Sequence, residues 1–305
     1  PLPWLIYAAT SGLVFLYSSL LCFFEGCSLV GNVQSVRFRI AVLTSMTMLA
    51  GLYFHLSLYA LSLSIVVSAV AGFFLVLKKF LCPMCQLWNL SREKVYPWWP
   101  EFSTLIWRYA ISWCSGYFIF QLFTPLAFKF HGSVFAGMVG ISIAMWTAGF
   151  NVSMTWLTAV NPRLNILVAE RDWSGLDRLF WKSLLRSMGT MLFGGSAFFL
   201  IYFSLFGQVD FFHRFLGAKS MLILFFCWLC QLYVNDVALY LRAHKREPLM
   251  ILSVLSAVYV AVTTYLCAEY LSEEWLFLGF LTSYLWGIPV VIKILNDQKR
   301  EHVEL

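Results

Sequence analysis

The sequence predicts an all-α polytopic membrane protein with about nine transmembrane helices. Of its 305 residues, 61% are hydrophobic and only 12% are charged, whereas a soluble globular domain carries about 25% charged residues. The apolar residues form stretches of about 20, which match a hydrocarbon core of roughly 30 Å at 1.5 Å per helical residue. A soluble protein of this composition could not cover its surface with polar groups.

The chain starts with Pro1 and not with methionine, and the first apolar stretch follows at once. The start shows no basic segment followed by a small-residue cleavage site, so it is not typical of a signal peptide. We therefore expect an internal fragment that lacks its true N-terminus.

Nine spans are expected from the apolar stretches, and every loop on one side of the membrane is short. They cover residues 3–24, 40–57, 59–77, 106–128, 133–159, 184–206, 218–241, 249–271 and 274–294. The second and third come from one apolar run over 40–77, which is too long for a single crossing. We place a turn around His55 to divide it.

Two longer segments separate groups of spans. Residues 78–105 form a link that contains Trp98 and Trp99 between prolines, as is typical of chain at the level of the lipid headgroups. Residues 162–183 carry apolar side chains at helical spacing with charges between them. This pattern predicts an amphipathic helix on the membrane surface. Residues 295–305 form a tail after the last span.

The basic residues predict the orientation. Of the 21 Lys and Arg residues, 18 fall in loops on one side of the predicted spans, and only Lys129, Arg214 and Lys219 fall on the other. The rich side is expected to face the cytoplasm, together with the C-terminus. The net charge of +6 therefore reflects topology, and no nucleic-acid partner is expected.

Three stretches resemble the polysaccharide-transporter branch of the multidrug/oligosaccharidyl-lipid/polysaccharide exporter superfamily, which contains the O-antigen and exopolysaccharide repeat-unit flippases. They are "LLCFFEGCSLVGNVQSVRFRI" (20–40), "GYFIFQLFTPLAFKFHGSVFAGMVGISIAMW" (116–146) and "NPRLNILVAERDWSGLDRLFWKSL" (161–184). The resemblance extends over nearly the whole chain.

The resemblance implies a transporter of about twelve helices in two six-helix lobes. Residues 1–77 would then be the last three helices of the first lobe, 78–105 the link between lobes, and 106–294 the complete second lobe. It also implies alternating access and a lipid-linked oligosaccharide as cargo.

A diphosphate requires cationic partners, and arginine matches phosphate oxygens best. Arg108 and Arg186 lie at the inner ends of predicted spans, where they could bind a phosphate or reach lipid headgroups. Lys129 lies at the outer end of a span and is either a phosphate contact or an interfacial anchor.

Uncharged polar residues within spans are the candidates for binding sugar hydroxyls. Gln121, Asn151 and Asn235 are of this kind, although such residues also bond to neighbouring helices. Pro125 is expected to bend its span.

Asp236 is the acid best placed for ion coupling. It could take up H⁺ or Na⁺, because charges inside spans usually face a cavity or a partner. Alternatively, it pairs with Arg242 or with an arginine of another helix.

No metal site is predicted. Cys82 and Cys85 form one CxxC pair, and no second pair follows to complete four zinc ligands. The other cysteines lie in or near spans, where they act as small apolar residues. No other cofactor is expected.

These observations together predict a flippase and not an enzyme. It would move undecaprenyl-diphosphate-linked repeat units across the bacterial inner membrane for surface polysaccharide synthesis. Membrane lipids, a polysaccharide polymerase and chain-length machinery would be its partners. The alternatives are a cation-coupled multidrug antiporter of the same superfamily and a membrane-embedded polysaccharide-processing enzyme.

Overall fold

The protein is an all-α polytopic membrane protein, as predicted. The computed structural model describes residues 2–91, 98–205 and 209–304, and in these ranges the chain forms helices and turns without strands. Eight of the helices described there are long and apolar enough to cross a membrane. The chain divides into two compact units, Pro1–Pro97 and Trp98–Leu305, so the division falls within the predicted 78–105 link.

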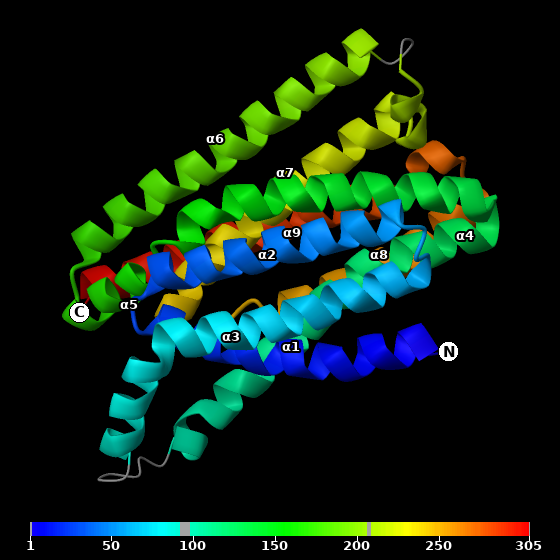
Figure 1. The fold of residues 1–305 in the computed structure, drawn as a ribbon. Coiled ribbons are helices and arrows are strands. Elements are labelled where there is room, and N and C mark those ends of the chain that lie inside the picture. The colour runs from blue at the N-terminus through cyan, green and yellow to red at the C-terminus, as the bar shows by residue number, and fades with distance from the viewer. Residues whose placement is uncertain (1, 92–97, 206–208, 305) are drawn as a thin grey trace. The chain divides into compact units, whose positions relative to one another are not determined.

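Unit 1 contains three helices, α1 (Leu2–Gly26), α2 (Val30–Tyr53) and α3 (Leu58–Ser91) (Figure 1). The turn expected around His55 is present, and His55 itself has a positive φ of 56°. The second span begins well before residue 40, because the polar start of α2 is helical too. Likewise, α3 continues past residue 77 into the predicted link.

The core of unit 1 lies where α1 and α2 both pack against α3. The rings of Phe24 and Phe80 stack with their centroids 4.3 Å apart. The Tyr17 hydroxyl lies 3.0 Å from the Ser68 hydroxyl and shares a hydrogen bond with it. At the α1–α2 turn, Arg37 forms an ion pair with Glu25 at 2.9 Å.

Unit 2 begins with α4 (Trp98–Thr158), which reverses direction at Gly132. Gly132 has φ 88° and ψ 178°, a conformation that a residue without a Cβ atom adopts easily. Figure 1 shows the two arms of α4 meeting at this bend. They correspond to the predicted spans 106–128 and 133–159, so the eight described helices of sufficient length account for all nine predicted spans. Pro125 stays inside the first arm.

The amphipathic segment forms the separate helix α5 (Asn161–Glu170) and the start of α6 (Trp173–Leu205). The break between them lies at Arg171, which has a left-handed φ of 59°. Leu164 and Leu167 of α5 are buried against side chains of α6 and α7. The expectation that this apolar face lies on the membrane is therefore wrong, because the protein itself covers it.

The remaining elements of unit 2 are η1 (Asp210–Arg214), α7 (Ala218–Ala243), α8 (Met250–Tyr270), η2 (Glu273–Trp275) and α9 (Leu278–Glu304). The helix α9 therefore extends through most of the predicted 295–305 tail. Side chains along these helices form two buried clusters, one rich in aromatic rings and one at the end where α5 lies.

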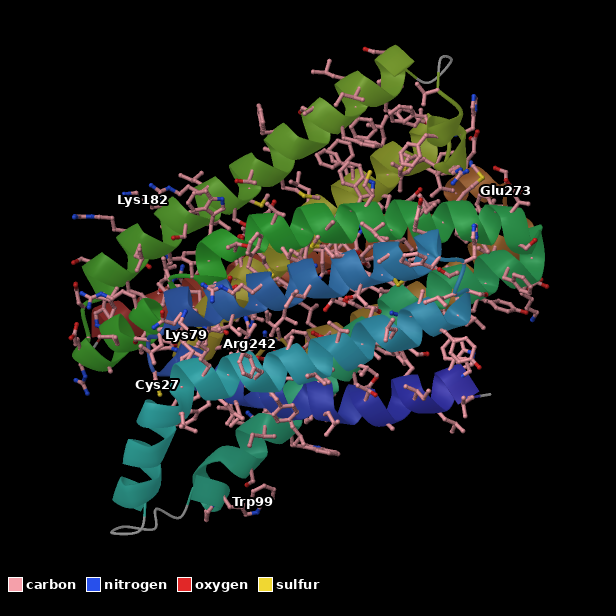
Figure 2. All side chains as sticks on the ribbon, viewed as in Figure 1. Cys27, Lys79, Trp99, Lys182, Arg242 and Glu273 are labelled. Atoms are coloured by element: carbon pink, nitrogen blue, oxygen red, sulfur yellow. The ribbon has the colours of Figure 1, made fainter. Side chains whose placement is uncertain are left out.

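The two ends of unit 2 differ in charge. One end, here called the basic end, consists of α5, the start of α6, the α7–α8 turn and the end of α9. It is held together by contacts such as the ion pair between Lys299 and Asp177 at 3.1 Å. At the opposite end, Lys219 pairs with Glu274 at 3.1 Å. In Figure 2, Lys182 and Arg242 lie toward the basic end and Glu273 toward the other.

Candidate functional site

Unit 2 contains a cavity of about 560 Å³ between the two arms of α4 and helices α7, α8 and α9. Its lining combines aromatic rings with amide and hydroxyl groups. The aromatic members are Trp113, Tyr117, Phe120, Phe150, Trp228, Phe280 and Tyr284. The uncharged polar members are Ser112, Thr147, Asn151, Thr158, Gln231, Asn235, Ser253, Ser256 and Ser283.

One face of α7 supplies the centre of this lining. Trp228, Gln231, Asn235 and Arg242 recur at intervals of three, four and seven residues, so they share one side of the helix. The Tyr284 hydroxyl donates to Gln231 Oε1 at 2.6 Å, and Asn235 Nδ2 donates to the Gln231 carbonyl at 3.0 Å. These bonds fix the two amide groups at the cavity wall.

Aromatic side chains hold the Trp228 ring in place. The ring stacks on Phe120 with centroids 4.9 Å apart, and Phe150 meets it at 5.2 Å with the planes inclined by 60°. On α9, the ring centroids of Phe280 and Tyr284 lie 5.3 Å apart. The cavity therefore offers rigid, flat apolar surfaces next to hydrogen-bonding groups.

The charged groups of the lining neutralise each other at the basic end. Arg242 Nε donates to Glu247 Oε2 at 2.6 Å, and Arg242 Nη2 donates to Glu247 Oε1 at 3.0 Å. The Arg242 side chain is 20% exposed and that of Glu247 only 2%. The Tyr109 ring lies 5.3 Å from the Arg242 guanidinium carbon. Because the pair is bidentate and well buried, it leaves the cavity without net charge.

Asp236 is fully buried on α7 and does not line the cavity. The alternative in which Asp236 pairs with Arg242 is wrong, because Glu247 occupies that guanidinium group. Ser187 of α6 lies beside Asp236. Within the described part of the chain, neither oxygen of the Asp236 carboxyl group has a hydrogen-bond partner. The Ser187 hydroxyl has none either.

The other predicted site residues are spread over unit 2. Asn151 lines the cavity, and its side-chain amide has no hydrogen-bond partner among the described residues. Arg108 and Gln121 are exposed on the first arm of α4, outside the lining.

Arg186 and Lys129 also lie away from the cavity, and each contacts aromatic rings. The Arg186 guanidinium lies 5.3 Å from the Trp156 ring centroid. The Lys129 ammonium lies 5.0 Å from the ring centroid of Phe130 and 5.6 Å from the ring centroid of Tyr265. The structure thus brings Asn151 and Asn235 to the cavity. Five predicted residues lie outside it, namely Arg108, Gln121, Lys129, Arg186 and Asp236.

Sequence reasoning missed Gln231, Trp228 and the Arg242–Glu247 pair. A usable signal was present, since Trp228, Gln231 and Asn235 repeat at helical spacing around a residue already recognised as polar. Glu247 carried no such signal, because it follows α7 and returns to it through a turn.

No group of three or more potential metal ligands occurs among the residues that the structure describes. The side chains of Cys82 and Cys85 lie outside the described set. No disulfide joins the cysteines whose side chains the structure describes; Cys227 and Cys267 among them are buried.

Comparisons with known protein families, with curated proteins and with solved structures find no match to this chain. Its function is therefore inferred from the cavity and from the chemistry of the residues around it.

Proposed function

We propose that the chain is a carrier of lipid-linked oligosaccharide. It moves undecaprenyl-diphosphate-linked repeat units from the cytoplasmic to the outer leaflet of the bacterial inner membrane by alternating access. The observation that carries this proposal is the intramembrane cavity of unit 2, which combines aromatic faces and amides with no net charge.

Such a lining fits a saccharide. Sugar hydroxyls need donors and acceptors at fixed positions, and the apolar faces of sugar rings pack against aromatic side chains. Asn151 offers an amide without a partner in the described chain, next to the fixed amides of Gln231 and Asn235. The rigid rings around Trp228 provide the stacking surface.

The same lining disfavours a cation-coupled drug antiporter. A cationic drug requires an unpaired carboxylate in its binding cavity, because a buried charge needs a counter-charge. The carboxylate of the described lining belongs to Glu247, which Arg242 already engages. For a polysaccharide-processing enzyme, we would expect a nucleophile or a general base in the cavity. The lining contains serines, but the carboxylate that could act as their base belongs to Glu247 and is engaged by Arg242. The described lining contains no His, Asp or Cys.

The diphosphate requires cations, and Arg242 is held by Glu247. We therefore keep Arg108 as the proposed phosphate contact at the inner mouth of the cavity. Its neighbour Tyr109 contacts Arg242, and the Arg108 side chain is exposed. Arg108, Arg186 and Lys129 all lie outside the lining, but only Arg108 directly precedes a residue that contacts a lining side chain, so Arg186 and Lys129 are not needed for this role.

Asp236 is the proposed coupling residue for H⁺ or Na⁺. A carboxyl group buried without a hydrogen bond is costly when charged, so uptake of a cation would offset that cost. We further propose that the basic end faces the cytoplasm, as expected for loops rich in lysine and arginine. The polymerase and the chain-length machinery of the pathway would then receive the cargo on the outer side.

The test is transport by the purified full-length protein in liposomes. A fluorescent saccharide on a short polyprenyl diphosphate is supplied to one leaflet, and its arrival in the other is measured by accessibility to a sugar-modifying enzyme. Asn151→Ala should slow transport about fivefold, because a hydrogen bond to the cargo is worth about 1 kcal/mol. Gln121→Ala is the matched control and should transport normally. Absence of transport by the wild-type protein would reject the proposal.

A further inference from the structure

Arg186 lies on an exposed side of α6 that also carries large apolar residues. Leu185 beside it is 69% exposed, and Phe193 two turns further along is 79% exposed. Because α6 is long and apolar enough to cross a membrane, we expect exposed side chains of this kind to face lipid. The arginine charge therefore sits at the edge of an apolar surface.

The position of the Arg186 side chain is supported by its neighbours. Its guanidinium lies over the Trp156 ring at 5.3 Å. The Trp156 indole is held in turn, because its Nε1 donates to the Thr190 hydroxyl at 2.8 Å. A cation–π contact orients the arginine, but it does not neutralise the charge.

Two further basic side chains lie on α6 between Arg186 and the start of the helix. Arg178, Lys182 and Arg186 are spaced four residues apart, and all three are exposed. Four residues of helix rise about 6 Å, so the three charges form a stripe along one side of α6. Figure 2 shows Lys182 on the outer side of this helix.

The stripe forms no ion pair within the described chain, although the Asp172 carboxylate lies close enough to Arg178 to interact with it electrostatically. In the described chain, no carboxylate lies within 4.0 Å of any of the three cations, whereas Arg242 and Lys299 at this end each form an ion pair. Asp177, which precedes the stripe, is engaged elsewhere. It accepts a hydrogen bond from the Tyr240 hydroxyl at 3.0 Å and pairs with Lys299 at 3.1 Å.

We propose that Arg178, Lys182 and Arg186 form a binding site for the phosphate of an anionic phospholipid. Charge complementarity favours an anionic headgroup, because a zwitterionic lipid brings its own cation to the site. Trp156 and Trp181 are 44% and 43% exposed beside the stripe, and indole rings prefer the headgroup level. The inference concerns the outer surface of unit 2 and does not depend on the cargo of the cavity.

The experiment measures lipid binding by the purified full-length protein. Native mass spectrometry compares phosphatidylglycerol with phosphatidylcholine, using the wild-type protein and the double variant Lys182→Gln/Arg186→Gln. The variant should bind phosphatidylglycerol about thirtyfold more weakly, since each basic side chain near an anionic surface contributes about 1 kcal/mol. Its affinity for phosphatidylcholine should be unchanged.

A matched control removes two charges elsewhere at the basic end. Arg163→Gln/Arg300→Gln has the same net charge, and both residues are exposed. This variant should retain the wild-type affinity for phosphatidylglycerol. An equal loss in both double variants would overturn the proposal in favour of general charge attraction, as would equal wild-type binding of the two lipids. Thermal unfolding of both variants confirms that they remain folded.

Discussion

Arg242 in the cavity wall and Arg186 on the outer surface of α6 both lie toward the basic end of unit 2, in opposite electrostatic settings. Arg242 is 20% exposed and bound through two hydrogen bonds to Glu247. Arg186 is exposed, and its described contact is an aromatic ring at 5.3 Å.

The difference follows from what each arginine can reach. A charge in the protein interior needs a counter-charge from the protein, because its desolvation is otherwise uncompensated. A charge on the outer surface can reach headgroup phosphates with its long side chain. Arg242 is therefore neutralised by Glu247 within the protein, whereas Arg186 has no described ion pair.

The largest expected loss of stability follows from breaking the buried ion pair between Arg242 and Glu247. Arg242→Ala leaves the Glu247 carboxylate, which is 2% exposed, without its partner. Removing one member of a buried pair costs about 3–5 kcal/mol, so the thermal unfolding temperature in detergent should fall markedly. Arg186→Ala should change stability by less than about 0.5 kcal/mol, as at other surface positions.

The double variant Arg242→Met/Glu247→Leu is the control for this comparison. It replaces both charges by apolar groups, so its stability should return close to that of the wild-type protein. Equal unfolding temperatures for Arg242→Ala and Arg186→Ala would contradict the distinction between interior and surface.

The next prediction compares the stability effects of alanine substitutions on two sides of α6, one packed against α7 and one open. A Cβ atom added at Gly195 would overlap the Phe225 ring of α7, whereas one added at Gly194 would meet no atom within 4 Å. Gly195→Ala should therefore destabilise the protein by about 1–3 kcal/mol through overpacking. Gly194→Ala should be neutral or slightly stabilising in a helix. Thermal unfolding of the two single variants measures the difference.

Equal effects of the two alanine substitutions would show that α6 does not pack tightly on α7 at this level. A rescue provides a further check. Combining Gly195→Ala with Phe225→Leu should restore part of the lost stability, because the smaller side chain gives room to the new methyl group.

Much of the fold could be predicted from the sequence, because hydropathy and chain length determine which segments cross a membrane. The residues at which the helices begin and end were harder to predict. The start of α2 was missed because Asn32, Gln34, Arg37 and Arg39 make it polar. Its helix extends beyond the apolar run, and hydropathy does not detect a polar helical turn.

The site was less accessible to sequence reasoning. A single polar residue in a span does not reveal which side of the helix faces a cavity, so Asn151 and Gln121 looked equivalent. The structure separates them. Proximity along the chain offered Asp236 as one possible partner of Arg242, whereas the turn after α7 returns Glu247 to it. Such a contact depends on the path of the turn and not on helical spacing.

Asp236 and Asp172 extend the comparison to acids. Asp236 is fully buried, and both its oxygens lack hydrogen bonds in the described chain. Asp236→Asn removes a buried charge at nearly constant volume, so the fold should gain about 1 kcal/mol. If Asp236 couples transport to an ion, this variant should also lose its dependence on the H⁺ or Na⁺ gradient in liposomes. Ser187→Ala is the control for a merely structural effect and should keep that dependence. Unchanged gradient dependence in Asp236→Asn would reject the coupling role.

The smallest effect concerns Asp172, an exposed acid that precedes α6. The Gly175 backbone N–H donates to its carboxylate at 2.9 Å, and the Ser174 hydroxyl donates to it at 3.0 Å. These two bonds hold the pKa of Asp172 below its ordinary value, with nearby Arg178 adding a minor effect. A lowered pKa means that the folded state favours the charged form. The stabilisation is therefore present above the ordinary pKa of about 4 and is lost as the pH falls through the lower folded value.

Thermal unfolding of the wild-type protein and of Asp172→Asn between about pH 3 and pH 6 tests this point. Asparagine retains an oxygen that accepts the capping hydrogen bonds, but it does not titrate. The difference in unfolding temperature between the two proteins should shrink as the pH falls toward 3. A constant difference over this range would show that the charge of Asp172 contributes nothing.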